Sequence, residues 1–302
     1  MYDSDNMGIQ ALEPGRCCYH YTGAEGMMGI TQGEFWVTER HFLNDKSEFA
    51  VGTETALKVI RSHLPGRGAC EKLCDALELE MKRIDRLGGL NDQIAFSGEY
   101  VISFSLDCDS ALMWSEFSGF QGYCLEFDCG ELLKAFDASD LVMNGRVIYD
   151  EAHQAELVEQ AIVEEFFKDE HFGFVDSWDS LANLGEREIG EIVMRLSVIC
   201  SVYNTFFKKE CFSGENEYRI SFSHIHDKGR VKVSERKPLF FRIKDGVLMP
   251  YVKKSFDSSR CIKSVLIGPK NSSDIAETGL RYFLRNEKID IPIERSSIPI
   301  RY

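Results

Sequence analysis

The apolar side chains of this chain change their spacing near residue 210, and that change limits the folds it can adopt. Between residues 192 and 206 apolar residues recur every three or four positions, which is typical of one buried helix face. From Glu217 to Phe222 they alternate with polar residues, the period of a strand with one face in a core. The first segment therefore predicts a core helix and the second a half-buried strand.

Other segments extend the same two patterns to both sides. We expect strands at 17–22, 34–38, 99–106, 122–128, 147–149, 217–222, 230–233, 239–243, 247–252, 261–267 and 289–293. We expect helices at 23–32, over most of 47–94, and at 109–117, 151–170, 181–209 and 271–284. Because strands bracket a helical middle instead of alternating with helices, the pattern predicts an α+β fold. Its core is a mixed, largely antiparallel sheet with a helical insertion.

The domain organisation follows from the absence of a linker rich in Pro, Gly or Ser. We expect a loose lead-in at 1–16 and a single α+β domain at 17–302, with the helical insertion at about 150–210. A hydrophobic content of 44% and an aromatic content of 12% indicate a packed core and argue against disorder.

Charge is unevenly distributed along the chain. The formal net charge is −14, so a uniformly acidic surface would repel phosphate backbones and broad nucleic-acid coating is disfavoured. Acidic residues crowd 150–191, whereas basic residues lead between 208 and 263. The basic stretch is either an ordinary solvated face or a local site for an anion.

Cysteine usage and the N-terminal sequence predict a cytoplasmic protein. The ten cysteines are scattered without a CxxC pair, so we interpret them as buried or half-buried thiols of a reducing compartment. The first residues lack the charged and apolar regions of a signal peptide, and no apolar run has the length of a membrane span. We therefore expect no membrane association.

Several common catalytic motifs are missing from the sequence. It contains no GxxxxGK[ST], GxGxxG, GxSxG or HExxH pattern. His224 and His226 are two residues apart, but two histidines alone do not make a metal site. We therefore predict no metal cofactor.

A series of short segments is similar to one known family. In order along the chain they are YHYT at 19–22, FWVT at 35–38, FLNDKSE at 42–48, VISFS at 101–105, MWS at 113–115, GYCLEF at 122–127, ENEYRI at 215–220 and VLIG at 265–268. Their order and spacing resemble the bacterial family called domain of unknown function 2971, over nearly the whole chain. That family has no settled activity, so the resemblance implies architecture more than chemistry.

A more distant resemblance concerns the first strands. A strand ending in Tyr-His-Tyr-Thr, a short helix and a strand with Trp36 are similar to the opening of ADP-ribosyltransferase-type folds. The resemblance implies an enzyme that uses NAD as a substrate, a transferase or glycohydrolase of toxin or phage-defence type. Its catalytic residues would be His20 and Glu217. A carboxylate stabilises the oxocarbenium-like transition state, and an imidazole fixes the sugar hydroxyls.

The same resemblance implies the surroundings of an NAD pocket. An aromatic ring packs on nicotinamide, and a guanidinium binds pyrophosphate through two hydrogen bonds. The NAD-binding candidates are Tyr21, Thr22, Trp36 and Arg219, and further pocket candidates are Asn44, Asp45, Glu48 and Glu215.

Structural interpretations compete with these roles. His20 is equally well explained as a core histidine, Asn44-Asp45 as a helix cap, and Glu217 with Arg219 as an exposed pair on one strand face. A core position is expected for Trp114.

Two other functions also remain open. One is a non-enzymatic sensor or interaction module whose acidic helices contact a partner, while its basic stretch binds an anionic ligand or nucleic acid. The other is a metal-independent nuclease or phosphotransferase that uses His20 with Arg219. The sequence thus leaves open whether the protein is an enzyme and whether its macromolecular target is protein or nucleic acid.

Overall fold

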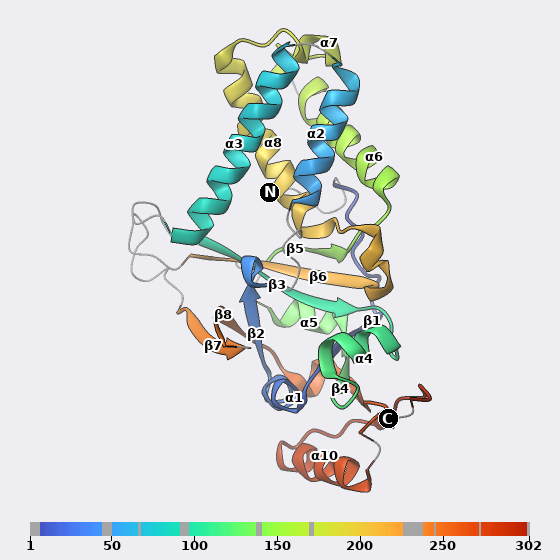
Figure 1. Ribbon diagram of the computed structural model, residues 1–302. Coiled ribbons are helices and arrows are strands. Elements are labelled where there is room, and N and C mark those ends of the chain that lie inside the picture. Colours follow the sequence, from blue (N-terminus) through green and yellow to red (C-terminus); the bar gives the residue numbers. More distant parts are fainter. Residues whose placement is uncertain are drawn as a thin grey trace.

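A bent sheet lies between a tall helical bundle at one end and a single helix, α10, at the other (Figure 1). The computed structural model describes residues 7–43, 50–65, 68–90, 97–136, 141–168, 172–225, 238–244, 246–271 and 273–300. The α+β fold with a mixed, mostly antiparallel sheet that the sequence predicts is confirmed.

The sheet is organised around β3, which pairs antiparallel with β1, β2 and β6. Its main path runs β10-β9-β4-β1-β3-β2-β8-β7, and β6 and β5 branch off beside β3. Among these pairs β9 and β10 are parallel. The strands are β1 Cys17–Thr22, β2 Glu34–Glu39, β3 Ser97–Ser105, β4 Tyr123–Asp128, β5 Leu141–Arg146, β6 Glu217–Ile225, β7 Phe240–Lys244, β8 Val247–Ser255, β9 Ile262–Ile267 and β10 Ile293–Arg295.

Several helices begin where the side chain of the preceding residue accepts a backbone N–H. Ser110, Asp128, Asp150 and Ser273 cap α4, α5, α6 and α10 in this way. The helices are α1 Ala24–Thr31, α2 Val51–His63, α3 Gly68–Leu90, α4 Ala111–Ser118, α5 Cys129–Ala135, α6 Glu151–Ile162, α7 Trp178–Leu181, α8 Glu186–Phe206, α9 Ser258–Cys261 and α10 Asp274–Asn286. Shorter helical segments are η2 Arg40–Phe42, the π-helical η3 Val163–Phe167 and η5 Glu210–Glu215.

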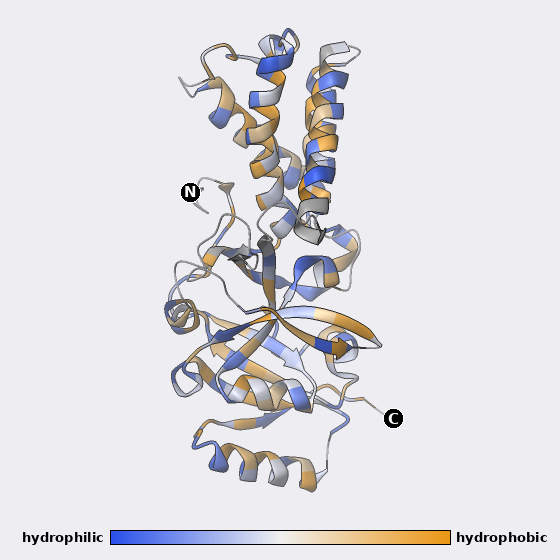
Figure 2. Ribbon diagram, turned by 90° about the vertical axis from the view of Figure 1, so that its left-hand side faces the viewer, coloured by the Kyte–Doolittle hydropathy of each residue, from blue (hydrophilic) through white to orange (hydrophobic). Residues whose placement is uncertain are grey.

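Two large hydrophobic cores hold these elements together, beside a smaller cluster of Tyr21, Met113, Trp114, Cys124 and Leu266. One fills the bundle of α2, α3, α6 and α8, and the other lies between one sheet face and helices α1, α5 and α10. Figure 2 shows hydrophobic and hydrophilic residues on the same bundle helices, as expected for amphipathic helices around a core. The predicted stripe at 192–206 is confirmed, because its residues are all buried in α8: Ile192, Leu196, Ile199, Tyr203 and Phe206.

Helix α8 is also long and apolar enough to cross a membrane. However, 61% of its most apolar window is buried inside the fold. It packs against α2 and α3, so its apolar character is explained by the core of the bundle.

The structure corrects several expectations about individual segments. The segment expected as a helical insertion at about 150–210 packs with the helices expected over 47–94, so the bundle is built from two stretches, 51–90 and 151–206. Met7 and Ile9 of the expected loose lead-in are 3% and 0% exposed, because they pack into the bundle core. The strand expected at 147–149 lies at 141–146, the last strand lies at 293–295, and α5 was not expected. The strand expected at 230–233 lies outside the described residues.

Candidate functional site

Strand register decides whether the two predicted catalytic residues meet. Tyr19 lies opposite Ser105 of β3, which lies opposite Glu217 of β6, so these three side chains share one face of the sheet. His20 is the next residue along β1 and therefore points to the other face. The expectation that His20 and Glu217 converge on one cleft is wrong, because the sheet separates them.

His20 lies among core aromatic rings. Its imidazole makes edge contacts with Phe35 and Phe104 at centroid distances of 5.6 and 5.7 Å. Its Nδ1 lies 3.1 Å from the carbonyl oxygen of Ser103. Burial lowers the pKa of His20 to about 4, and the hydrogen bond to Ser103 only partly offsets this effect. The imidazole is therefore neutral at pH 7, and its surroundings are those of a core histidine.

Glu217 and Arg219 share a strand face, as their spacing predicts, but they are buried and not exposed. Their exposed fractions are 5% and 1%. Arg219 Nε and Nη2 donate to the two Glu217 carboxylate oxygens at 2.9 and 2.8 Å. Lys208 Nζ lies 3.5 Å from Glu217 Oε2 and 2.5 Å from Glu215 Oε2. Both predicted carboxylates, Glu215 and Glu217, are thus held by buried cations.

The electrostatics of this cluster oppose a catalytic role for Glu217. Burial alone would raise its pKa, but the charges of Arg219 and Lys208 hold the pKa below its usual value. Arg219 Nη1 also donates to the carbonyl oxygen of Thr205 at the end of α8, at 2.8 Å. These contacts fasten β6 to the bundle and leave Arg219 buried instead of facing a ligand.

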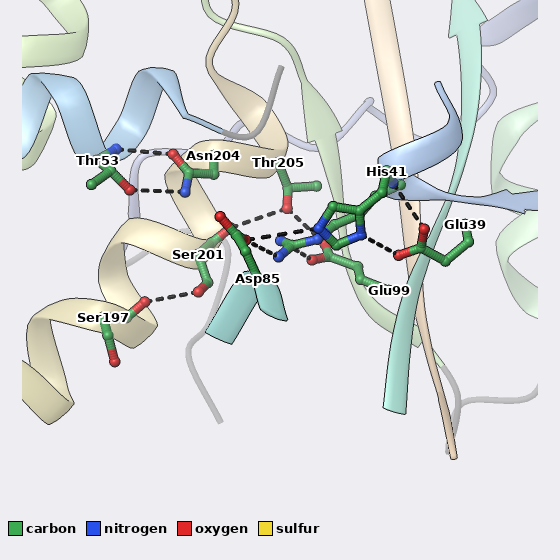
Figure 3. A network of polar contacts seen from close by, with 10 residues as sticks. Glu39, His41, Thr53, Asp85, Glu99, Ser197, Ser201, Asn204 and Thr205 are labelled. Atoms are coloured by element: carbon green, nitrogen blue, oxygen red, sulfur yellow. Dashed lines mark hydrogen bonds and ion pairs between the residues drawn. The ribbon is translucent and has the colours of Figure 1, made fainter. Parts of the chain in front are cut away.

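A polar network continues from this cluster across the junction between sheet and bundle (Figure 3). The Thr205 hydroxyl donates to Glu99 of β3 at 2.7 Å. Arg40 donates to Glu99 at 3.2 Å and to Asp85 of α3 at 2.9 Å. His41 Nδ1 lies 2.7 Å from Glu39. We did not predict this network, because its residues are far apart in sequence and share no motif.

Because His41 belongs to this network, we expect the stability of the fold to depend on its protonation. Hydrogen bonds with Asp85 and Glu39 raise the pKa of His41 from 6.5 to about 9. A raised folded-state pKa stabilises the fold below pH 6.5, and this contribution is lost as the pH rises towards 9. We expect the melting temperature of the native protein to fall more steeply across this interval than that of His41→Gln.

Thermal melts at pH 6 to 9.5 measure this difference. His153→Gln, on the exposed face of α6, is the matched control and should follow the native curve. Parallel curves of melting temperature against pH for the native protein and His41→Gln would contradict the raised pKa of His41.

The other predicted pocket residues do not form a common site. Tyr21 is 4% exposed, and its hydroxyl donates to the carbonyl of Asp107 at 2.6 Å and accepts from Ser110 N at 3.0 Å. Its ring packs edge-on against Trp114, which is 0% exposed as expected for a core residue. Thr22 is half-buried at the end of β1. Asn44, Asp45, Glu48, His226 and the side chain of His224 lie outside the described residues.

A depression lies on the same sheet face as Glu217. It has a volume of about 430 Å³ and is lined by Tyr19, Leu106, Asp107, Cys108, Asp109 and Ser110. The Asp109 carboxylate accepts hydrogen bonds from Trp114, Ser296 and Ser297. Partial desolvation and the nearby carboxylates of Asp109 and Glu126 raise the pKa of Cys108, so this solvent-exposed thiol is not activated. Cys211 is exposed too, so the expectation of uniformly buried thiols is wrong at these two positions.

Trp36 differs from the other candidates because it is 45% exposed. It stacks on Tyr251 with ring centroids 4.8 Å apart, and Tyr251 stacks on Phe240 at 5.7 Å. These rings lie on one face of β2, β8 and β7, since Trp36 is opposite Lys253 and Tyr251 is opposite Phe240. We call the surface formed by Trp36, Phe240, Arg242, Tyr251 and Lys253 the aromatic–basic surface.

Two cations lie next to these rings, Lys253 beside Trp36 and Phe240 and Arg242 beside Tyr251. Lys253 Nζ is 5.8 Å from the Trp36 ring centre and 5.0 Å from that of Phe240. Arg242 Nη2 donates to the Thr38 hydroxyl at 2.7 Å. Its Nε is buried and has no hydrogen-bond acceptor within the part of the chain that the structure describes. The exposed Trp36 ring and the exposed Lys253 side chain therefore lie together here, above the buried Tyr251 ring.

A metal centre is not formed by the described residues, where no group of three His, Cys, Asp or Glu side chains is placed to hold an ion. The aromatic–basic surface, with its stacked rings and adjacent cations, is suited to bind planar, anionic ligands.

Comparison with known proteins finds a similarity over part of the chain. Residues 113–220 match the family model described as protein of unknown function (DUF2971). The match covers α4 to the middle of β6, including Trp114 and the Glu217–Arg219 pair, so this stretch is similar to that family. No curated protein and no solved structure matches the chain. The comparisons do not support the resemblance to ADP-ribosyltransferase-type folds.

Proposed function

We propose that this protein is a non-enzymatic interaction module that binds single-stranded nucleic acid through the aromatic–basic surface. The observation that carries the proposal is the exposed indole of Trp36, stacked on Tyr251 and flanked by Lys253. A base can extend such a stack on the free side of the indole, because every base has a π-face. Stacking of this kind contributes about 1–3 kcal/mol per base.

The charge distribution supports a small and local contact. The formal net charge of −14 disfavours wrapping of a long nucleic acid, whereas Arg242 and Lys253 supply positive charge next to the rings. Two phosphate contacts would give a slope of log K against log salt of roughly −1.4 for a single strand. We therefore expect the affinity for nucleic acid to fall only modestly as the salt concentration rises.

The acidic helices α6 and α8 lie in the helical bundle above β3 and β6 in the view of Figure 1, whereas β7 and β8 lie below these strands. In this proposal the acidic helices provide the face for a second macromolecular partner, as expected of a sensor. All ten cysteines are free thiols, which supports placing the protein in the reducing cytoplasm.

The geometry does not favour the NAD-using alternative. His20 and Glu217 lie on opposite sheet faces, and Tyr21 and Arg219 are engaged in buried contacts. The same holds for a nuclease that pairs His20 with Arg219, since these two residues also lie on opposite faces.

Binding of a fluorescent hexanucleotide, followed by anisotropy, tests the proposal. Trp36→Ala should weaken binding roughly 5- to 150-fold, the equivalent of about 1–3 kcal/mol. Tyr282→Ala is the matched control, because Tyr282 is an exposed aromatic residue, at 71%, on the distant α10.

Three outcomes would count against the proposal. They are no binding by the native protein, equal binding by the native protein and Trp36→Ala, and an equal loss in Tyr282→Ala. Incubation with NAD is a parallel assay, and release of nicotinamide that is lost in Glu217→Gln at an unchanged fold would establish the enzyme instead.

A further inference from the structure

A carboxylate lies at the edge of the exposed indole. Glu34 is two residues before Trp36 on β2, so both side chains lie on the same sheet face. Its Oε1 accepts from Trp36 Nε1 at 2.8 Å and from Lys253 Nζ at 2.9 Å. These bonds fix the carboxylate beside the stacking ring, while the side chain remains 31% exposed.

Glu34 is ionised at neutral pH. Partial burial would raise its pKa, but the hydrogen bonds from Lys253 and Trp36 hold the pKa below its usual value. An ionised carboxylate accepts hydrogen bonds and donates none. Oε1 already has two donors, and Oε2 has no donor among the residues that the structure describes. The Oε2 atom therefore offers an acceptor to the edge of a stacked base.

The four common bases differ at that edge. Guanine presents two adjacent donors, N1–H and the 2-amino group, to a carboxylate. Adenine and cytosine place a ring nitrogen acceptor beside their amino group, and uracil places its single N–H between two carbonyl oxygens. A carboxylate repels these acceptors, so a negatively charged oxygen beside a stacked base discriminates in favour of guanine.

We propose that the aromatic–basic surface selects guanine, with Trp36 stacking on the base and Glu34 Oε2 accepting from its N1–H and 2-amino groups. This inference rests on the proposed function of the same surface. Lys253 has two roles in it, since it holds Glu34 in place and lies near enough to the ring for its charge to face the phosphate of the bound nucleotide. A good pair of hydrogen bonds to a base edge discriminates by about tenfold or more.

Four labelled hexauridylates test the preference, one unmodified and three with a single central guanosine, adenosine or inosine. The native protein should bind the guanosine strand roughly tenfold more tightly than the adenosine strand. Inosine lacks the 2-amino group and should give an intermediate affinity. In Glu34→Gln the ratio of guanosine to adenosine affinity should fall to near one, because the neutral amide no longer offers a charged acceptor to the guanine edge.

The matched control is Glu116→Gln, which removes an exposed carboxylate on α4 and should keep the native ratio. Equal affinities of the native protein for the guanosine and adenosine strands would overturn the guanine preference and leave the nucleic-acid proposal standing. A native ratio that persists in Glu34→Gln would remove Glu34 from the recognition. Failure of all four strands to bind would instead overturn the proposed function itself.

Discussion

Replacement of Glu217 by glutamine should lower the free energy of unfolding by about 3–5 kcal/mol. Glu217 is 5% exposed and accepts from Arg219 through both carboxylate oxygens. Glutamine keeps the shape but removes the negative charge, so Arg219 is left buried with its charge less well compensated. In a chain of 302 residues this loss corresponds to a fall in melting temperature of roughly 5–10 °C.

Calorimetry or denaturant unfolding of two variants measures this effect. Glu210→Gln is the control, because Glu210 is an exposed glutamate in η5 and its loss should change stability by less than about 0.5 kcal/mol. An unchanged melting temperature for Glu217→Gln would show that the ion pairs contribute little, and it would reopen a catalytic role for this carboxylate.

The dependence of the unfolding free energy on pH, below neutral pH, is an independent test of the role of Glu217. Its folded-state pKa lies below the usual value, so its ionised form stabilises the fold at neutral pH. This contribution is lost as the pH falls through the folded-state pKa. The difference in stability between the native protein and Glu217→Gln should therefore narrow as the pH is lowered below 4.5, the ordinary pKa of a glutamate.

Alanine at Gly52 should destabilise the protein by about 1–3 kcal/mol, because no space exists for a β-carbon where α2 crosses α8. A Cβ at this position would lie 2.6 Å from the backbone nitrogen of Asn204 and 2.7 Å from the carbonyl carbon of Tyr203. Its neighbour Thr53 exchanges two hydrogen bonds with the Asn204 side chain, at 2.9 and 3.0 Å (Figure 3). Separation of the helices would strain both bonds.

Gly190→Ala in α8 provides a control of opposite sign. A Cβ at Gly190 meets no atom within 4 Å, so alanine should stabilise the helix by roughly 0.5–1 kcal/mol. Urea unfolding of the two variants gives both values. A neutral or stabilising effect of Gly52→Ala would mean that α2 and α8 approach less closely than the structure has them.

Much of the fold was predictable because it depends on local pattern. The alternation at 217–222 and the stripe at 192–206 each identify one element, since the period of the apolar residues sets the element that can bury them. Short elements escaped prediction for the same reason. Helix α5 has seven residues and begins at the Asp128 cap directly after β4, so it offers too few turns for a period.

The candidate site was less predictable than the fold. Trp36 was identified from the sequence, but its stacking partners Tyr251 and Phe240 lie more than 200 residues further on, and only strand pairing brings them together. Glu34 and Lys253 were not singled out, since a lone carboxylate or lysine on a strand carries no signal of a site. The network of Arg40, Asp85 and Glu99 escaped prediction because its contacts span 45 and 59 residues.

The sequence by itself determined most of the longer helices and strands and which side chains alternate along each strand, because these depend on neighbouring residues. Only the tertiary structure decided which strands pair and in what register, and register assigns each side chain to one face of the sheet or the other. That choice placed His20 in an aromatic core, Glu217 under the helical bundle and Trp36 on the surface. These three residues could not be distinguished in the sequence, because their surroundings are made by parts of the chain far from each of them.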